Sequence, residues 1–375
     1  RFAGTGSGLR IFDPERGVAN GAVSEEGKFL IVKDAKDIAR QWVIEEASKM
    51  PGFYGAYCAG SANWLPDDAV LPATSDVDVW VVYTSPKPPE KLGKFIYRDV
   101  MLEVSYQPSD QLQSTDRVLG DYHMAGCFRT PSIILDPSGQ LTEFQTTVSR
   151  DYAKRQWVCK RCEDAMNRIR QNLQKVSESE LFHDQVACWL FAAGVTTHVL
   201  LVAGLENPTV RRRYVAAREL LADYSRLDFY EDLLEMLGCA RMGRMDVEHH
   251  LAALTDVFDV AKEVIKTPYR FAADISDISR PIAIDGSWEL IERGYHREAI
   301  FWIVATYSRC QHVLHHDASV EMQERFSHGY RQLLGDLGIT AFADLQQRSG
   351  QVDRFLPRVW EVAEAIMAAN SEIEN

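Results

Sequence analysis

The chain has 375 residues, a formal net charge of −13 and a sequence pI near 5.3. Hydrophobic residues make up 46% and charged residues 25%, which is the balance of a globular protein and excludes a disordered, collagen-like or coiled-coil chain. Aspartate and glutamate outnumber lysine and arginine by 54 to 41, so nucleic acid is an unfavourable partner, and a compact, even cationic, small molecule suits the charge better.

The first ~140 residues alternate short apolar runs with turn signals, which predicts a small α/β domain at residues 1–145. Residues 28–33 are expected to form a strand or a short lead-in, and a helix is expected from Asp34 to the turn at Pro51-Gly52. The strands expected after this helix are residues 53–59, 77–83, 100–106 and 132–135, and the β-branched run 77–83 is the strongest of them.

Residues 146–375 carry an almost wholly helical pattern, so the fold class expected is α+β, with the α/β domain followed by an all-helical domain. Helices are expected at residues 150–176, 181–205, 245–265, 288–315, 320–337 and 356–369, the last with Pro357 in its first turn. One more helix is expected to begin at the cap Asn207, followed by Pro208 in its first turn.

Residues 181–205 form the most apolar stretch, but it includes His183, Asp184 and His198, which predicts a buried core helix and no membrane span. The seven cysteines lack zinc spacing, and the Cys159-x-x-Cys162 pair lies in a helical pattern without a second pair. Free thiols and no visible signal peptide predict a cytoplasmic protein. The oligomeric state is not predicted.

Three features of the first domain point to phosphate chemistry. Gly60-Ser61 ends one expected strand, Asp76-Val77-Asp78 opens the next, and Glu103 lies within a third. Residues i and i+2 of a strand project from the same face, so Asp76 and Asp78 are expected to present two carboxylates side by side. Such a pair repels unless a cation lies between them, and Mg²⁺ is the hard cation that carboxylates and phosphates share.

The third carboxylate has two candidates. Glu103 is preferred because its surroundings are the more apolar, while Asp99 would project from the same face if the strand began earlier. Glu103 could bind a metal or take a proton from an attacking hydroxyl. Gly60 would let the backbone approach a phosphate, and Ser61 would add a hydroxyl and, if a helix starts there, an anion site.

The segments 57–61 and 75–82 resemble the hallmark of the nucleotidyltransferase superfamily of the DNA polymerase beta type, in which Gly-Ser precedes an Asp-x-Asp set among apolar residues. The spacer between Ser61 and Asp76 is longer than usual in that family. Among its members the chain looks most similar to the antibiotic (aminoglycoside-type) nucleotidyltransferases and their uncharacterised relatives.

This resemblance implies a mixed-sheet core with Asp76, Asp78 and Glu103 as catalytic metal ligands, Mg²⁺ as cofactor and ATP as substrate. It further implies transfer of AMP to a hydroxyl of a small molecule such as an aminoglycoside-like compound, as in antibiotic resistance, with phosphates bound by Gly60-Ser61, Arg211 and Arg212. The alternatives are a catalytically silent, nucleotide-binding regulator and a protein-modifying, antitoxin-type enzyme.

The helical half also contains two weak matches to the Arg-x₄₋₆-His pattern of helical RNases of the HEPN type, Arg244 with His249 and Arg309 with His315. Ten histidines and many arginines make chance matches expected. His315 and His316 are therefore interpreted as a helix end, where the helix dipole favours histidine.

Overall fold

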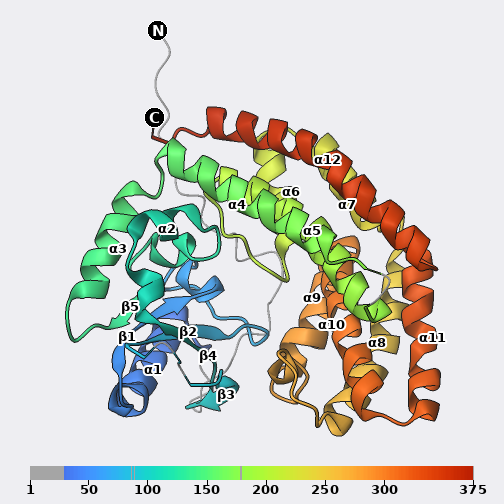
Figure 1. Ribbon diagram of the computed structural model, residues 1–375, viewed down its shortest axis with the longest axis horizontal. Coiled ribbons are helices and arrows are strands. Elements are labelled where there is room, and N and C mark those ends of the chain that lie inside the picture. The colour runs from blue at the N-terminus through green and yellow to red at the C-terminus, as the bar shows by residue number, and fades with distance from the viewer. Residues whose placement is uncertain (1–28, 86, 88, 178–179, 375) are drawn as a thin grey trace.

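The computed structural model describes residues 29–374 apart from residues 86, 88, 178 and 179, so the part of the first domain before residue 29 lies outside the described residues. A five-stranded sheet near the N-terminus is followed by a largely helical region, which confirms the predicted α+β class (Figure 1). The strands are β1 Phe53–Ala59, β2 Val77–Tyr83, β3 Gly93–Tyr97, β4 Val100–Pro108 and β5 Ile133–Leu135. The helices are α1 Val32–Glu45, α2 Thr115–Gly120, α3 Gln140–Asp151, α4 Arg155–Gln174, α5 Phe182–Ala203, α6 Arg213–Asp223, α7 Leu227–Leu237, α8 Arg244–Val264, α9 Gly286–Glu292, α10 His296–Asp317, α11 Val320–Asp336 and α12 Phe342–Ala369.

The sheet is mixed, with strand order β3-β4-β2-β1-β5. The central strands β2 and β4 are parallel, and every other neighbouring pair is antiparallel. All four predicted strands are present, and β3 is an additional edge strand that the sequence pattern did not predict. A tight turn at Arg98 and Asp99, both with positive φ, joins β3 to β4.

The two faces of the sheet differ in character. Alternate residues of β2, among them Val77 and Val79, pack with Leu102 and Val104 of β4 and with α1 in one apolar cluster. On the opposite face, α2 and α3 cover the β1 side through a second cluster that includes Tyr57. The remaining part of that face, over β3 and β4, lies toward the helical region and carries the charged residues described below.

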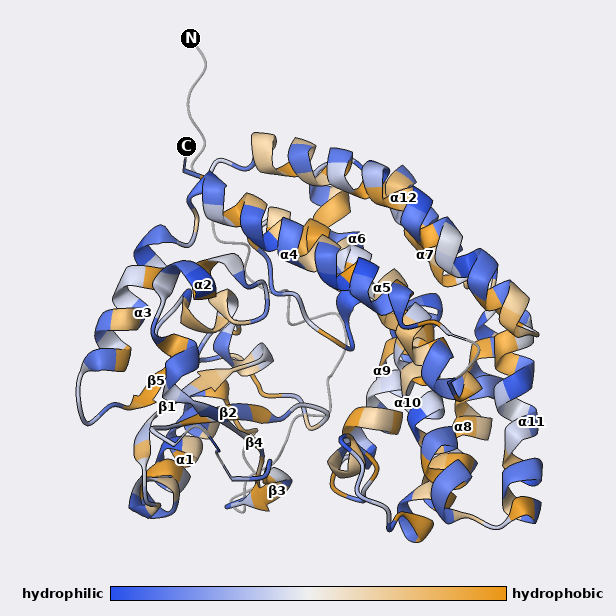
Figure 2. Cartoon of the chain, in the orientation of Figure 1, coloured by the Kyte–Doolittle hydropathy of each residue, from blue (hydrophilic) through white to orange (hydrophobic). Residues whose placement is uncertain are grey.

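Helix α5 is the centre of the helical region. It packs against α4, α10 and α12, and its side chains belong to one continuous apolar cluster. By length and composition α5 could cross a membrane, but 83% of its apolar window is buried inside the protein, as the core-helix prediction requires. Figure 1 shows α4 and α12 arching over this region, and in Figure 2 hydrophilic and hydrophobic residues alternate along both.

Several predicted helix boundaries were wrong. The helix expected at Asn207 begins at Arg213, because the preceding turn is held by hydrogen bonds from His198 and Arg213 to the carbonyls of Thr209 and Val210. The helix expected at 150–176 is α4, which begins later, at Arg155, and α3 is an additional helix that ends just before it at Asp151. The helix expected at 288–315 is divided into α9 and α10 by the positive-φ Gly294.

Pro357 lies inside α12 and not in a first turn, since the helix begins 15 residues earlier at Phe342 (357 − 342 = 15). Residues 28–33 are a lead-in within the described part, where Ile31 bridges Val70 and α1 begins at Val32. Residue 145, the predicted domain boundary, falls inside α3, whose Leu141 and Val148 pack beneath the sheet. The boundary itself stays a prediction.

Candidate carboxylate site

One row of side chains crosses three strands at the open face of the sheet. Asp78 of β2 lies opposite Glu103 of β4 in the parallel register, and Lys94 of β3 lies opposite Glu103 in the antiparallel register. Directly paired residues project from the same face. The hydrogen-bonded register therefore places the three charged side chains next to one another.

Asp76 joins this row from the residue just before β2. One carboxylate oxygen of Asp76, one of Asp78 and one of Glu103 all lie within 4.8 Å of one another. The side chains of Asp76 and Glu103 are only 17% and 15% exposed. Asp99, the other candidate for the third carboxylate, lies exposed at the turn between β3 and β4. The structure thus brings together the three carboxylates that the sequence singled out.

Lys94 supplies positive charge at the centre of this group. Its ammonium Nζ contacts Glu103, lies 3.0 Å from Asp76 Oδ2 and is 3.5 Å from Asp274 Oδ1 of the helical region. The lysine side chain is only 7% exposed. Lys91 forms a second, more exposed ion pair with Glu103.

The three carboxylates therefore have different electrostatic surroundings. Burial raises the pKa of Asp78 well above its usual range, and the charges of Asp76 and Glu103 raise it further. Burial also raises the pKa of Asp76, against the opposing charge of Lys94. For Glu103, burial acts in the same direction, but Lys94 and Lys91 outweigh it and lower the pKa to about 2. No cationic side chain of the described residues forms an ion pair with Asp78.

Gly60 is required by the approach of Asp78. Its backbone has φ 63° and ψ −162°, a combination that is essentially restricted to glycine. A Cβ at this position would collide with the Asp78 carboxylate. Ser61 begins a three-residue 3₁₀ helix, and the anion site expected at this helix start stays a prediction.

Of the two predicted phosphate-binding arginines, Arg211 lies beside the row. Its Nη2 donates to the carbonyl and hydroxyl oxygens of Thr74, at 3.1 and 3.3 Å, two residues before Asp76. Burial lowers the pKa of Arg211, and the charge of Asp76 acts in the opposite direction. Arg212 has a buried Nε without a hydrogen-bond partner among the described residues. Neither guanidinium forms an ion pair with the carboxylates in the described structure.

Lys94 and Asp274 are the site residues that sequence reasoning missed. β3 follows a proline-rich stretch, and its residues Gly93–Tyr97 precede a tight turn and the strand expected at 100–106. That hairpin arrangement was the available signal for Lys94. Asp274 comes from a 3₁₀ turn 171 residues after Glu103 in the chain (274 − 103 = 171), and no local pattern connects the two.

Comparisons with known proteins add little. No protein-family model matches the chain, and no curated protein matches it. A crystal structure of a nucleotidyltransferase-like protein from Exiguobacterium sibiricum 255-15 is similar at 14% identity, covering 69% of this chain and 91% of that chain, with a TM-score of 0.28. The superposition is too poor at that TM-score to support a functional argument, which depends instead on the carboxylate geometry.

Proposed function

We propose that this chain is a metal-dependent nucleotidyltransferase that moves a nucleotidyl group, AMP from ATP, to a hydroxyl of a small molecule. The observation that carries the proposal is the convergence of Asp76, Asp78 and Glu103, with oxygens within 4.8 Å, on one face of a mixed sheet. Structural carboxylates are rarely gathered in this way without a cation.

The donor set fits Mg²⁺. Three carboxylates offer only hard oxygen ligands, and Asp78 has no ion-pair partner among the described cations, so a divalent ion would compensate its charge. Asp76, Asp78 and Glu103 would hold the ion. When bound, Mg²⁺ offsets phosphate charge and polarises a phosphoryl oxygen.

Residues of this chain would bind the cation and the phosphates of ATP. Glu103, whose pKa is held at about 2 by the two lysines, is a poor proton acceptor and is suited to binding a cation. Arg211 and Arg212 lie on the helical side, where guanidinium groups would bind the phosphates of ATP. Attack of the acceptor hydroxyl oxygen on the α-phosphorus forms one P–O bond and breaks the bond to the departing pyrophosphate, while the hydroxyl proton passes to solvent.

The acceptor is proposed from the resemblance and from charge. The net charge of −13 favours a cationic molecule, which an aminoglycoside-like compound would be, and disfavours nucleic acid. A cytoplasmic location is likewise proposed, supported by seven cysteines that are all free.

Lys94 favours one alternative function. Its ammonium already forms ion pairs with Asp76 and Glu103. In a chain that binds nucleotide without turnover, this ammonium would take the place of the metal ion. In that case ATP binding would not depend on Mg²⁺. In an active transferase, both binding and pyrophosphate release would depend on the metal.

The test measures ATP affinity by calorimetry and pyrophosphate release against aminoglycosides, lincosamides and proteins, with and without Mg²⁺. Asp78→Asn should lower Mg²⁺-dependent release by at least about 100-fold, because it removes a charged ligand. Asp99→Asn, at the exposed turn, is the matched control and should leave release unchanged. Metal-independent ATP binding without release would support the silent alternative, and no ATP binding would contradict both functions.

A further inference from the structure

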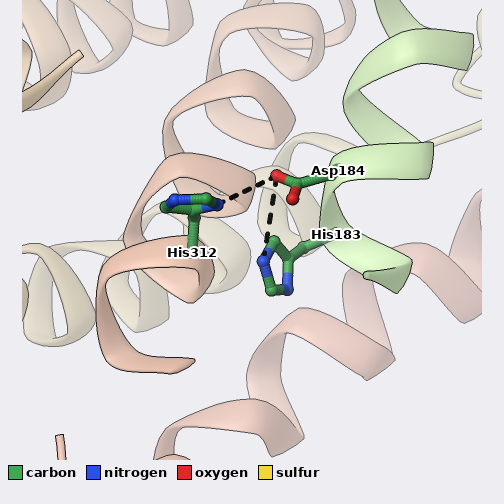
Figure 3. Close-up of side chains that lie close together, drawn as sticks. All are labelled: His183, Asp184 and His312. Carbon is green, nitrogen blue, oxygen red and sulfur yellow. Dashed lines mark hydrogen bonds and ion pairs between the residues drawn. The ribbon is translucent and has the colours of Figure 1, made fainter. Parts of the chain in front are cut away.

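A second group of potential ligands lies in the helical region, apart from the carboxylates of the sheet. His183 and Asp184 occupy the first turn of α5, and His312 comes from the last turns of α10, 128 residues after Asp184. Figure 3 shows both imidazole rings beside the Asp184 carboxylate. One possible ligand atom from each residue lies within 4.8 Å of the other two.

The distances to one carboxylate oxygen are close to those of a metal site. Asp184 Oδ1 lies 3.1 Å from Nδ1 of His312 and 3.8 Å from Nε2 of His183. Ligands bound tetrahedrally to zinc at about 2.0–2.1 Å lie roughly 3.3–3.4 Å from one another. The two observed distances fall on either side of that spacing, so small side-chain shifts would complete the coordination.

His183 has an unsatisfied polar atom directed at the group. Its Nε2 is buried and has no hydrogen-bond partner among the described residues, because 3.8 Å to Asp184 is too long for a hydrogen bond. A buried ring nitrogen without a partner is costly, and in native proteins it usually indicates a water or ion at that place. A cation between the three residues would satisfy it.

A simple histidine–carboxylate pair elsewhere in the same region shows the difference. His250 Nε2 lies 2.9 Å from Asp336 Oδ2, and His312 Nδ1 makes the same kind of hydrogen bond to Asp184 Oδ1 at 3.1 Å. The His250 ring also has a buried nitrogen without a partner, but among the described residues only Asp184 has a second histidine, His183, close enough to share a metal ion. The ring of His312 is additionally stacked on Tyr269 at 4.2 Å between centroids. The stacking holds the His312 ring in place, as neighbours of metal-binding histidines commonly do.

We propose that His183, Asp184 and His312 bind a divalent transition-metal ion of the zinc type, which joins the start of α5 to the end of α10. Two imidazoles and one carboxylate select such ions over Mg²⁺, whereas the all-carboxylate site of the sheet has the opposite preference. Two exposed histidines at the end of α10 are placed to supply a fourth ligand: His316, 4.6 Å from His312 between ring centroids, and His315, 5.9 Å from His183.

The experiment uses the full chain, stripped with a chelator and kept in excess Mg²⁺ so that the carboxylate site is occupied. Zn²⁺ is titrated by calorimetry, and Co²⁺ is titrated by visible absorption, which reports four-coordinate nitrogen and oxygen ligation directly. One equivalent of Zn²⁺ should bind, and His183→Gln, Asp184→Asn and His312→Gln should each weaken binding at least about 100-fold.

Two control variants separate this site from the rest of the molecule. His328→Gln, at an exposed position of α11, should leave Zn²⁺ affinity unchanged. Asp78→Asn should also leave it unchanged, so the result stands whether or not the proposed transferase activity is found. Zn²⁺ binding that is equal in wild type and the three ligand variants, or no visible Co²⁺ band, would overturn the proposal.

Discussion

The sheet region and the helical region bury ionisable side chains in different ways. In the sheet, Lys94 and the carboxylates of Asp76, Asp78 and Glu103 lie in one row and interact through their charges. Removing any one of them changes the electrostatic environment of the others. The sheet therefore concentrates buried charge at a single place.

The helical region disperses such groups. The guanidinium groups of Arg161 and Arg213 lie 4.1 Å from the ring centroid of Tyr152 and 3.8 Å from that of Phe301, and both arginines donate hydrogen bonds to backbone carbonyls. His198, 1% exposed, donates similarly to a carbonyl. Each group has a partner close by, although Arg161 Nε, Arg213 Nη1 and His198 Nδ1 are buried without a hydrogen-bond partner among the described residues. Concentrated charge is thus the exception in this molecule, which supports a functional role for the row.

The largest effect should come from removing the central cation of the row. Lys94→Met leaves Asp76 without its ammonium partner and Glu103 with only the more exposed Lys91, so the free energy of unfolding should fall by about 3 kcal/mol. Added Mg²⁺ should restore part of the loss, because it replaces the missing positive charge. Urea unfolding with and without Mg²⁺ measures both.

Lys36→Met is the matched control, since Lys36 pairs with Asp67 at the surface, where the aspartate is 67% exposed. Its cost should stay below about 1 kcal/mol. Equal costs for the two lysine variants would mean that the row is an ordinary set of surface ion pairs.

Gly60→Ala should have the next largest effect. The new Cβ would meet the Asp78 carboxylate in a backbone conformation restricted to glycine, which should lower the unfolding free energy by about 2 kcal/mol and displace Asp78. Gly139→Ala is the comparison, because Gly139 has φ 75° but open space around its Cβ. It should cost about 1 kcal/mol and leave nucleotide binding unchanged. Reduced ATP affinity in both variants would contradict the specific role of Gly60.

The hydrogen bonds from Arg211 to Thr74, which connect the helical region to the sheet region, should contribute less to the free energy of unfolding. Arg211→Met removes the hydrogen bonds to Thr74, and the unfolding free energy should fall by about 1.5 kcal/mol. If Arg211 also binds phosphate, the affinity for ATP should fall while Arg218→Met, whose guanidinium lies over Tyr295, leaves it unchanged. Unchanged ATP affinity in Arg211→Met would limit this arginine to a structural role.

The smallest expected effect is a loss of stability at acidic pH caused by the buried His198 of the helical region. Burial lowers the pKa of His198 well below 6.5, so below that pH the unfolded chain binds a proton that the folded chain excludes. Between pH 7.5 and pH 6 the unfolding free energy should therefore fall by about 0.8 kcal/mol from this group. His198→Gln should remove that part of the pH dependence, as measured by chemical unfolding at both pH values. A pH profile identical to wild type would mean that His198 has the same pKa in the folded and unfolded chain.

Much of the sheet region follows from the sequence alone. Period-two alternation and β-branched residues identify β1, β2, β4 and β5, and the same alternation puts Asp78 on the face opposite Val77 and Val79. Helical spacing likewise identifies α5 and α8. Other boundaries were harder to predict. The start of α6 is delayed by hydrogen bonds from His198 of α5 and from Arg213, and the positive-φ Gly294 separates α9 from α10.

What the sequence by itself determined is the carboxylate set, because an Asp-x-Asp pair within an apolar run has few structural explanations. Only the tertiary structure decided which cations face that set. The register of β3 against β4 places Lys94 beside the carboxylates, and packing of the helical region against β3 places Asp274 next to Lys94. The same holds for His183, Asp184 and His312, since a site built from two helices depends on their packing and leaves no trace in local spacing.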